Sequence, residues 1–256
     1  IAVRNIKSIA IPPLGSHNGG LDWHRVKPMV ENALTDLDCD VYIYEPSQDI
    51  IDKLKSERVK LTPARAMLLT MFKDLIDNGE FASVFAAEKL IYFMQRFGGK
   101  EVFRIDFKPY YYGPYSGGKV AHMLYALNGS YIQGMGGMDA RPFDYIWLLK
   151  DAGQEAWRYL ESLHESQNIK DICIKTQTFL QEYYSNYSLE LLSSVDYLLN
   201  TVPALQNWRY ESRDYVLDTL ADEISRWSKR KEQIFNKNHL ADAYHYLAGQ
   251  DALWQA

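Results

Sequence analysis

Cysteine is scarce in this 256-residue chain, and its two cysteines stand far apart. Cys39 and Cys173 form no CxxC pair, and no paired histidines with metal-ligand spacing accompany them. A disulfide framework needs several bridges, and a zinc site needs closely spaced ligands, so neither is expected here. We therefore predict reduced thiols, no metal site and no disulfide scaffold.

Long apolar runs are also absent. No stretch approaches the roughly 18 to 20 apolar residues of a membrane-spanning helix, and the N-terminus lacks the charged-then-apolar pattern of a secretory signal. Glycine and proline number only 15 and 9, whereas 47% of residues are hydrophobic and 24% are charged. Such proportions exclude collagen-like and disordered chains. We expect a cytoplasmic protein that buries a core and has no membrane partner.

Basic residues are fewer than acidic ones, at 28 against 33. The formal net charge is −5, which argues against a generally basic surface for nucleic acid. The imbalance is concentrated, because residues 176–225 hold eight acidic and two basic side chains, whereas residues 226–237 hold five basic and one acidic. Runs of this kind are usually solvated helix faces, and a surface for an oppositely charged partner is the alternative.

The start of the chain predicts a strand, a helix and a second strand. Residues 6–11 and 41–45 have strand patterns, and apolar residues recur at spacings of three and four between positions 23 and 37. Two parallel strands bury too little surface to be stable alone. We therefore expect that the chain is a piece of a longer protein, whose upstream sequence supplies the rest of the sheet.

A second, mainly helical domain is expected over residues 61–256, after the strand–helix–strand piece at 1–46 and a charged connector at 47–60. Its first part, to residue 150, has the helix and strand order of a winged-helix-like domain, and the part from 151 on is helical. The fold class is α+β, mainly α. The predicted elements are helices from 62 to 77, 83 to 97, 117–127, 152–166, 169–184, 188–200, 210–234 and 238–249, and strands at 102–107, 130–133 and 144–149. The segment 110–116 is predicted as a loop.

The loop after the first strand is a candidate phosphate site. Gly15, Gly19 and Gly20 allow backbone amides to turn inward beside a helix N-terminus, and that geometry binds phosphate. The spacing does not match the dinucleotide pattern GxGxxG, because the middle glycine is missing. A plain tight turn is the alternative, and a lone loop histidine such as His17 is more often solvated than catalytic.

Several segments carry a family resemblance. Residues 8–15, 18–23 and 41–46 resemble the end of a macrodomain, and specifically that of the DarG family of antitoxins, which oppose DarT-like DNA ADP-ribosyltransferase toxins. Further on, residues 87–95, the motif at 112–116 and residues 131–134 resemble the C-terminal, toxin-binding domain of the same family. The match runs in order from about residue 6 to 150.

The resemblance implies a macrodomain that binds ADP-ribose and removes it from thymidine in DNA, joined to a domain that binds the toxin. The family's catalytic lysine lies before the strand at 6–11, so no catalytic residue is assigned, and the chain alone is expected to be inactive. ADP-ribose is expected only as the ligand of the complete macrodomain, with ADP-ribosylated DNA as partner of the full-length protein. The phosphate-loop positions that carry over are Gly15, Ser16, His17, Asn18, Gly19, Gly20 and Leu21.

Aromatic and acidic residues together suggest a partner surface. Carboxylates and aromatic rings imitate phosphates and bases, so such a surface can occupy the basic groove of a DNA-binding toxin. Core packing of the rings and a solvated helix face are the alternatives. The candidate partner-binding residues are Tyr110, Tyr112, Tyr115, Tyr183, Trp208, Asp214, Asp218 and Asp222.

Three functions remain open on the sequence. The leading one is an antitoxin that binds a DarT-like toxin and occupies its DNA-binding surface. The second is a DNA ADP-ribosyl glycohydrolase in the full-length protein. The third is a winged-helix protein that binds duplex DNA as an autoregulator, against which the net charge of −5 argues.

Overall fold

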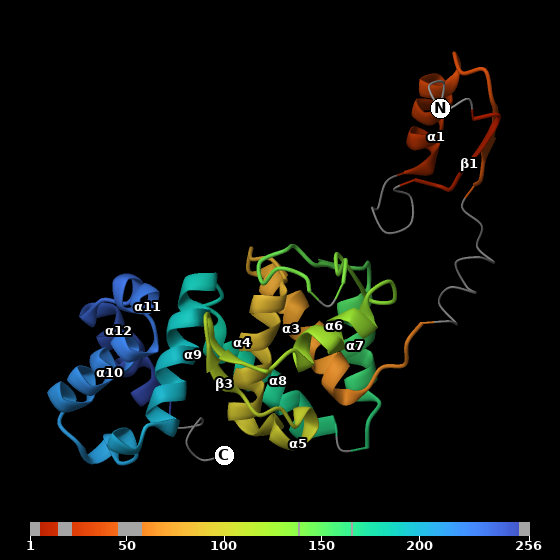
Figure 1. Ribbon diagram of the computed structural model, residues 1–256. Coiled ribbons are helices and arrows are strands. Elements are labelled where there is room, and N and C mark those ends of the chain that lie inside the picture. Colours follow the sequence, from red (N-terminus) through yellow and green to blue (C-terminus); the bar gives the residue numbers. More distant parts are fainter. Residues whose placement is uncertain (1–5, 15–21, 46–57, 138, 165, 251–256) are drawn as a thin grey trace. The chain divides into compact units, whose positions relative to one another are not determined.

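The computed structural model describes residues 6–14, 22–45, 58–137, 139–164 and 166–250 (Figure 1). The chain divides into two compact units, residues 1–60 and residues 61–256. The fold is α+β and mainly α, as the sequence predicts. Within the described ranges, no helix is both long enough and apolar enough to cross a membrane.

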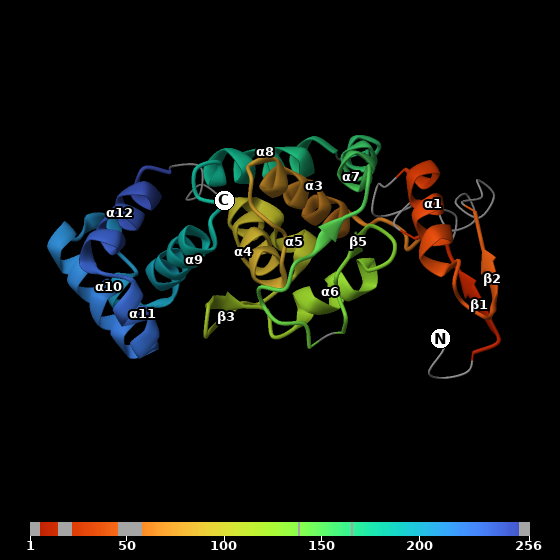
Figure 2. The ribbon, with the colours of Figure 1, turned by 90° about the horizontal axis from the view of Figure 1, so that it is seen from above.

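The first unit contains a parallel strand–helix–strand arrangement. Its elements are β1 (Ser8–Ile11), α1 (Trp23–Leu34) and β2 (Asp40–Ile43). The two strands pair in parallel, with Ile9 opposite Val41, and the helix forms the crossover between them (Figure 2). The Asp22 side chain caps α1 by accepting a hydrogen bond from the amide of His24 at 3.0 Å. The predicted order of elements is confirmed here, although the helix ends at Leu34 rather than at residue 37.

The second unit is built mainly from helices. In order, its elements are α3 (Pro63–Asp77), α4 (Val84–Met94), η2 (Gln95–Gly99), α5 (Lys100–Phe103), β3 (Lys108–Tyr110), β4 (Gly113–Tyr115), α6 (Lys119–Leu127), β5 (Ile132–Gln133), β6 (Trp147–Leu148), α7 (Ala152–Glu161), α8 (Ser166–Leu180), α9 (Asn186–Thr201), η3 (Pro203–Leu205), η4 (Trp208–Tyr210), α10 (Arg213–Trp227), α11 (Lys229–Ile234) and α12 (Lys237–Ala248).

Local sequence explains where the first helices of this unit begin. The hydroxyl of Thr62 accepts a hydrogen bond from the amide of Arg65, and Pro63 occupies the first helical position, where its missing N–H costs nothing. Ser83 caps α4 in the same way. Nearly the whole surface of α4 is buried, including the charged residues Glu88 and Lys89. This helix is therefore the centre of the core.

Two expectations about this region are wrong. The strand predicted over 102–107 is absent from those residues, because Gly98, at φ +103°, turns the chain into a further helical turn that continues to Phe103. Conversely, the segment 110–116 predicted as a loop contains β4, which pairs with β3 as an antiparallel hairpin. The hairpin packs against α4 and α9 (Figure 2).

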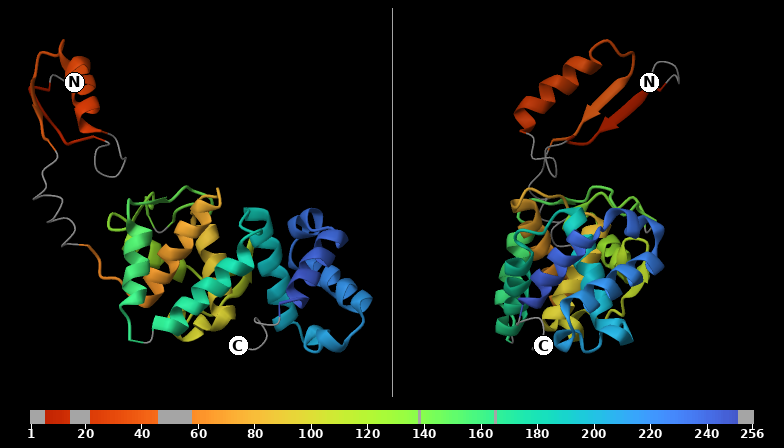
Figure 3. Two further views of the ribbon diagram at one scale, coloured as in Figure 1. Left: turned by 180° about the vertical axis from the view of Figure 1, so that it is seen from behind. Right: turned by 90° about the vertical axis from the view of Figure 1, so that its left-hand side faces the viewer.

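The C-terminal helices occur in the predicted order, but those expected over 152–166 and 169–184 end earlier, at Glu161 and Leu180, and another is divided. The helix expected over 210–234 is divided, because Ser228 adopts an extended backbone with φ −166°. The Ser228 hydroxyl then accepts a hydrogen bond from the amide of Lys231 at 3.1 Å and caps α11. Helix α9 lies between α4 on one side and α10 and α12 on the other (Figure 3).

A buried carboxylate joins α9 to α4. Asp196 is fully buried and accepts hydrogen bonds from Tyr92 Oη at 2.6 Å and from Arg96 Nε at 2.8 Å. Burial, with the neighbouring charge of Asp196, raises the pKa of Tyr92 well above its ordinary value, so the phenol remains a donor. Hydrogen bonds to a charged group stabilise by about 1.5 to 3 kcal/mol each. This contact fixes α9 against the core.

Candidate interaction site

The predicted phosphate loop lies outside the described residues. What the structure describes are its two flanks, which are the end of β1 at Ile11 and the capped start of α1 at Asp22. The loop thus connects the carboxyl end of a parallel strand to a helix N-terminus, where anions are commonly bound. The loop positions that remain a prediction are Gly15, Ser16, His17, Asn18, Gly19, Gly20 and Leu21.

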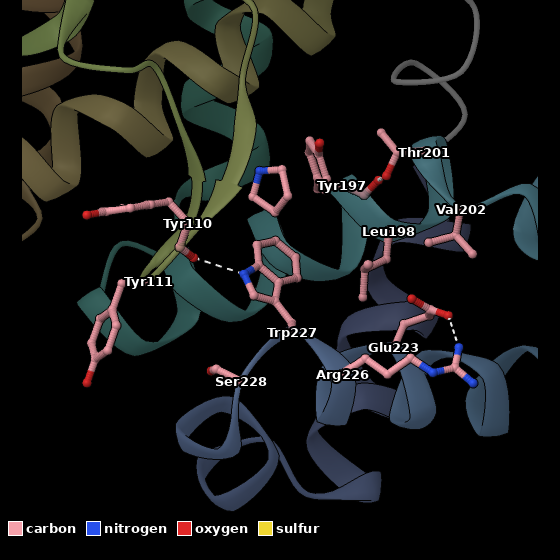
Figure 4. A pocket seen from close by; sticks show the side chains of 11 residues that line it. Tyr110, Tyr111, Tyr197, Leu198, Thr201, Val202, Glu223, Arg226, Trp227 and Ser228 are labelled. Carbon is pink, nitrogen blue, oxygen red and sulfur yellow. Dashed lines mark hydrogen bonds and ion pairs between the residues drawn. The ribbon is translucent and has the colours of Figure 1, made fainter.

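A groove of about 770 Å³ opens between the β3–β4 hairpin, α9 and the end of α10 (Figure 4). Aromatic rings and apolar side chains make up most of its lining, and one acidic and one basic residue stand at its rim. The lining residues are Pro109, Tyr110, Tyr111, Tyr197, Leu198, Thr201, Val202, Glu223, Arg226, Trp227 and Ser228.

Contacts across the groove fix its width. Trp227 donates a hydrogen bond from Nε1 to the carbonyl oxygen of Tyr110 at 2.9 Å, which ties α10 to the hairpin. The Trp227 ring also packs on Tyr197 of α9, with ring centroids 5.7 Å apart. Glu223 and Arg226 form an ion pair along α10. The groove is consequently formed before any partner arrives.

The rings of the hairpin are exposed but held in place. Tyr110 is 62% exposed and Tyr111 is 51% exposed. Tyr110 stacks on Tyr115 with ring centroids 5.0 Å apart, and the guanidinium of Arg230 lies 5.4 Å from the Tyr111 ring and 4.9 Å from the Tyr112 ring. Exposed rings with a fixed orientation lose little entropy when they bind a flat or apolar group.

Beneath the hairpin, buried charges hold its backbone. Lys89 Nζ donates to the carbonyl oxygen of Pro114 at 2.6 Å, while Glu88 accepts hydrogen bonds from the amide and the hydroxyl of Ser116 at 3.0 and 2.7 Å. Burial raises the pKa of Glu88 and lowers the pKa of Lys89. Gly113 has φ +105°, and a Cβ there would lie 3.1 Å from Ser194 Oγ. The hairpin therefore needs glycine at this position.

A further buried carboxylate, on α9, links that helix to α11. Glu190 accepts hydrogen bonds from Arg230 Nη1 and from Lys231 Nζ, each at 2.7 Å. Burial alone would raise the pKa of Glu190, but these two cations outweigh it and hold the pKa below its ordinary value. The guanidinium of Arg230 also packs against the rings of Tyr111 and Tyr112, so its ion pair with Glu190 helps to position these rings.

The structure separates the predicted partner-binding rings. Tyr110, Tyr112 and Tyr115 lie together on the hairpin or beside it. Tyr183 is half-buried and packs on Tyr246, with ring centroids 4.2 Å apart. Trp208 is only 6% exposed and packs edge-on against Tyr244, so its ring belongs to the core of the C-terminal helices and is not an accessible anchor.

The predicted acidic residues form one exposed face. Asp214, Asp218 and Asp222 recur every four residues on α10, and all three are exposed. Asp218 forms an ion pair with Lys237 of α12 at 2.5 Å, which neutralises part of the face. The groove-lining residues of α10 occupy a neighbouring face, because they stand at positions 223, 226 and 227.

The predicted site residues do not include Arg226 and Trp227, which line the groove. The signal near them in the sequence is the change from an acidic stretch to a basic one after position 225, which indicates a solvated helix face or a partner surface without singling out these two residues. Trp227 meets Tyr110 across 117 positions of the chain, and only the fold brings them together.

Potential metal ligands and thiols are dispersed in the part of the chain that the structure describes. Among the described residues, no group of three or more histidine, cysteine or carboxylate side chains is placed to hold a metal ion. Both cysteines are free thiols. Burial raises the pKa of Cys173 to about 12, which keeps that thiol neutral at ordinary pH.

The described residues define a two-unit α+β protein whose helical unit carries a preformed aromatic groove. The chain is similar to the DNA ADP-ribosyl glycohydrolase of Thermus aquaticus, at 34% identity over 260 aligned positions that cover 98% of this chain and 66% of the relative. It is also similar to proteins of the same name from Mycobacterium bovis and Mycobacterium tuberculosis, at 27% identity over 93% of this chain and 68% of each relative. The chain thus spans about two thirds of the length of these curated relatives. No protein-family model matches it.

Proposed function

We propose that this chain is part of a DNA ADP-ribosyl glycohydrolase of the DarG family. The proposal rests on the 34% identity to the Thermus aquaticus enzyme, which extends over 98% of the chain and therefore includes both units. The parallel strand–helix–strand arrangement of the first unit is compatible with the end of a macrodomain, as the family resemblance implies. The substrate would be ADP-ribose attached to a DNA base.

The loop between β1 and α1 is the proposed diphosphate site. Glycines at positions 15, 19 and 20 would let the diphosphate approach the backbone amides, and the N-terminus of α1 adds positive potential. The family resemblance assigns the catalytic lysine to sequence before β1. This chain would therefore contribute ligand binding, and the rest of the complete protein would contribute catalysis.

The complete protein and an ADP-ribosylated single-stranded oligonucleotide provide the test. The expected result is release of ADP-ribose, detected by mass spectrometry, and a much lower rate for Gly19→Glu, which places a carboxylate where the diphosphate should lie. Gly136→Ala is the matched control, because a Cβ at Gly136 meets nothing within 4 Å. A complete, folded protein that leaves the oligonucleotide modified would contradict the proposal.

A second function is favoured by the exposed acidic face of α10. We propose that the helical unit, which we interpret as winged-helix-like in its first part, binds a DarT-like toxin and blocks its DNA-binding surface. Support comes from Asp214, Asp218 and Asp222, whose carboxylates stand one helical turn apart in solvent and can imitate phosphates. In the winged-helix interpretation, the β5–β6 hairpin is the wing, and Ala82 extends its sheet by bridging to Ile146.

A further inference from the structure

The β3–β4 hairpin separates the aromatic groove from a second groove of about 520 Å³. Pro109 and Tyr110 line both grooves, so the exposed Tyr110 ring stands between them. The second groove is lined by Asp106, Lys108, Pro109, Tyr110, Tyr115, Ser116, Gly117 and Lys119. We call the two grooves together the hairpin track.

The lining of the hairpin track has a slight excess of basic residues, although the whole chain carries a net charge of −5. Lys108 and Lys119 are exposed in the second groove. Arg226 lines the first groove. The acidic residues that line the track are Asp106 in the second groove and Glu223, which pairs with Arg226, in the first. The lining of the track thus holds three basic and two acidic residues, whereas the whole chain has an excess of acidic residues.

Aromatic rings line the same track as these cations. Tyr110 and Tyr111 have exposed ring surfaces, and Trp227 and Tyr197 line the floor beside them. Rings stack on unpaired bases of any sequence, and a basic groove follows the phosphate backbone between them. Duplex DNA offers no free base faces to such rings.

We propose that the hairpin track binds single-stranded DNA. The inference rests on the proposed function and deepens it, because it assigns a contact for the substrate strand to the helical unit. A protein segment could also occupy an aromatic groove, but the exposed lysines of the second groove favour a polyanion. A strand bound here would be held by stacking on Tyr110 and by phosphate contacts to Lys108 and Lys119.

The test uses the 256-residue chain and a fluorescein-labelled, unmodified 20-nucleotide single strand, with fluorescence anisotropy as the readout. Saturable binding that weakens between 50 and 200 mM salt is expected, together with much weaker binding of the matching duplex. Tyr110→Ala should weaken binding by about fivefold or more. Lys108→Glu should weaken it and lower the dependence on salt.

Matched controls separate the track from the rest of the chain. Tyr210→Ala removes a ring that is 91% exposed on η4, and Lys175→Glu reverses an exposed charge on α8; neither residue lines the track. Both variants should bind like the parent, and circular dichroism should show that all variants are folded. The proposal is overturned if the parent shows no saturable binding at tens of micromolar, if duplex binds as tightly, or if Tyr110→Ala and Lys108→Glu bind like the parent. This experiment measures binding of an unmodified strand and not hydrolysis. Failure to bind would therefore overturn the hairpin-track proposal without contradicting the proposed glycohydrolase function, which the release of ADP-ribose tests separately.

Discussion

Trp227 donates its indole hydrogen to the carbonyl oxygen of Tyr110 at 2.9 Å, so the last residue of α10 is tied to a hairpin 117 positions earlier. The backbone of the hairpin is held from the opposite side by Lys89, whose ammonium group donates to Pro114. The hydrogen bonds from Trp227 and from Lys89 therefore both fix the backbone that carries the aromatic rings. Each hydrogen bond can be removed by its own substitution.

The first prediction concerns the indole contact. Trp227→Phe keeps most of the ring packing but removes the donor, so it should lower the free energy of unfolding by about 0.5 to 1.5 kcal/mol. Urea unfolding followed by circular dichroism measures this difference. Trp147→Phe is the matched control, because Trp147 is 56% exposed on β6 and should change stability by less than about 0.5 kcal/mol. Equal stabilities of Trp227→Phe and the parent would show that the hydrogen bond is unimportant.

The second prediction concerns the glycine of the hairpin. Gly113 combines φ +105° with close approach to Ser194 Oγ and Lys89 Nζ, at 3.1 and 3.2 Å from a built Cβ. Gly113→Ala should therefore lower the free energy of unfolding by about 1 to 3 kcal/mol and shift the hairpin. Gly136→Ala, where a Cβ meets nothing within 4 Å, should be close to neutral. Similar unfolding midpoints for the two variants would contradict the tight packing.

The sequence predicts well the elements that are specified locally. Thr62, Pro63 and Ser83 mark helix starts through capping chemistry that does not depend on the rest of the fold. The hairpin was missed because its strands are three residues long, and the Gly113–Pro114 pair has the composition of a loop. Trp227 and Tyr110 form a site only through long-range packing, which no local pattern encodes. The phosphate loop, outside the described residues, stays a prediction.

The third prediction concerns thiol reactivity and its pH dependence. Burial raises the pKa of Cys173 to about 12, so the reactive thiolate should be negligible below about pH 10. Cys39 is half-buried. A disulfide reagent such as DTNB should therefore label one thiol per native chain, and the second only after unfolding. In Cys39→Ser the rapid labelling should disappear. Fast labelling of two thiols in the native chain would show that Cys173 is accessible.

The last prediction tests whether the acidic face of α10 meets a basic partner. Changing Asp214, Asp218 and Asp222 to lysine brings residues 176–225 from a net charge of −6 to zero. All three carboxylates are exposed, so the change should lower the free energy of unfolding only a little. The exposed Asp218–Lys237 ion pair is lost as well, but exposed ion pairs contribute little to stability.

Association with a DarT-like toxin should become about tenfold slower or more at low salt, and the difference should shrink at high salt, because electrostatic attraction mainly sets association rates. Surface plasmon resonance measures both rates. A control with lysine at Glu101, Asp139 and Asp151 has the same change in net charge, but its exposed carboxylates lie outside α10. Slowing in the α10 variant alone would locate the partner at this helix. Equal slowing in both variants would mean that only net charge matters, and unchanged rates in the α10 variant would exclude the acidic face as an imitation of DNA.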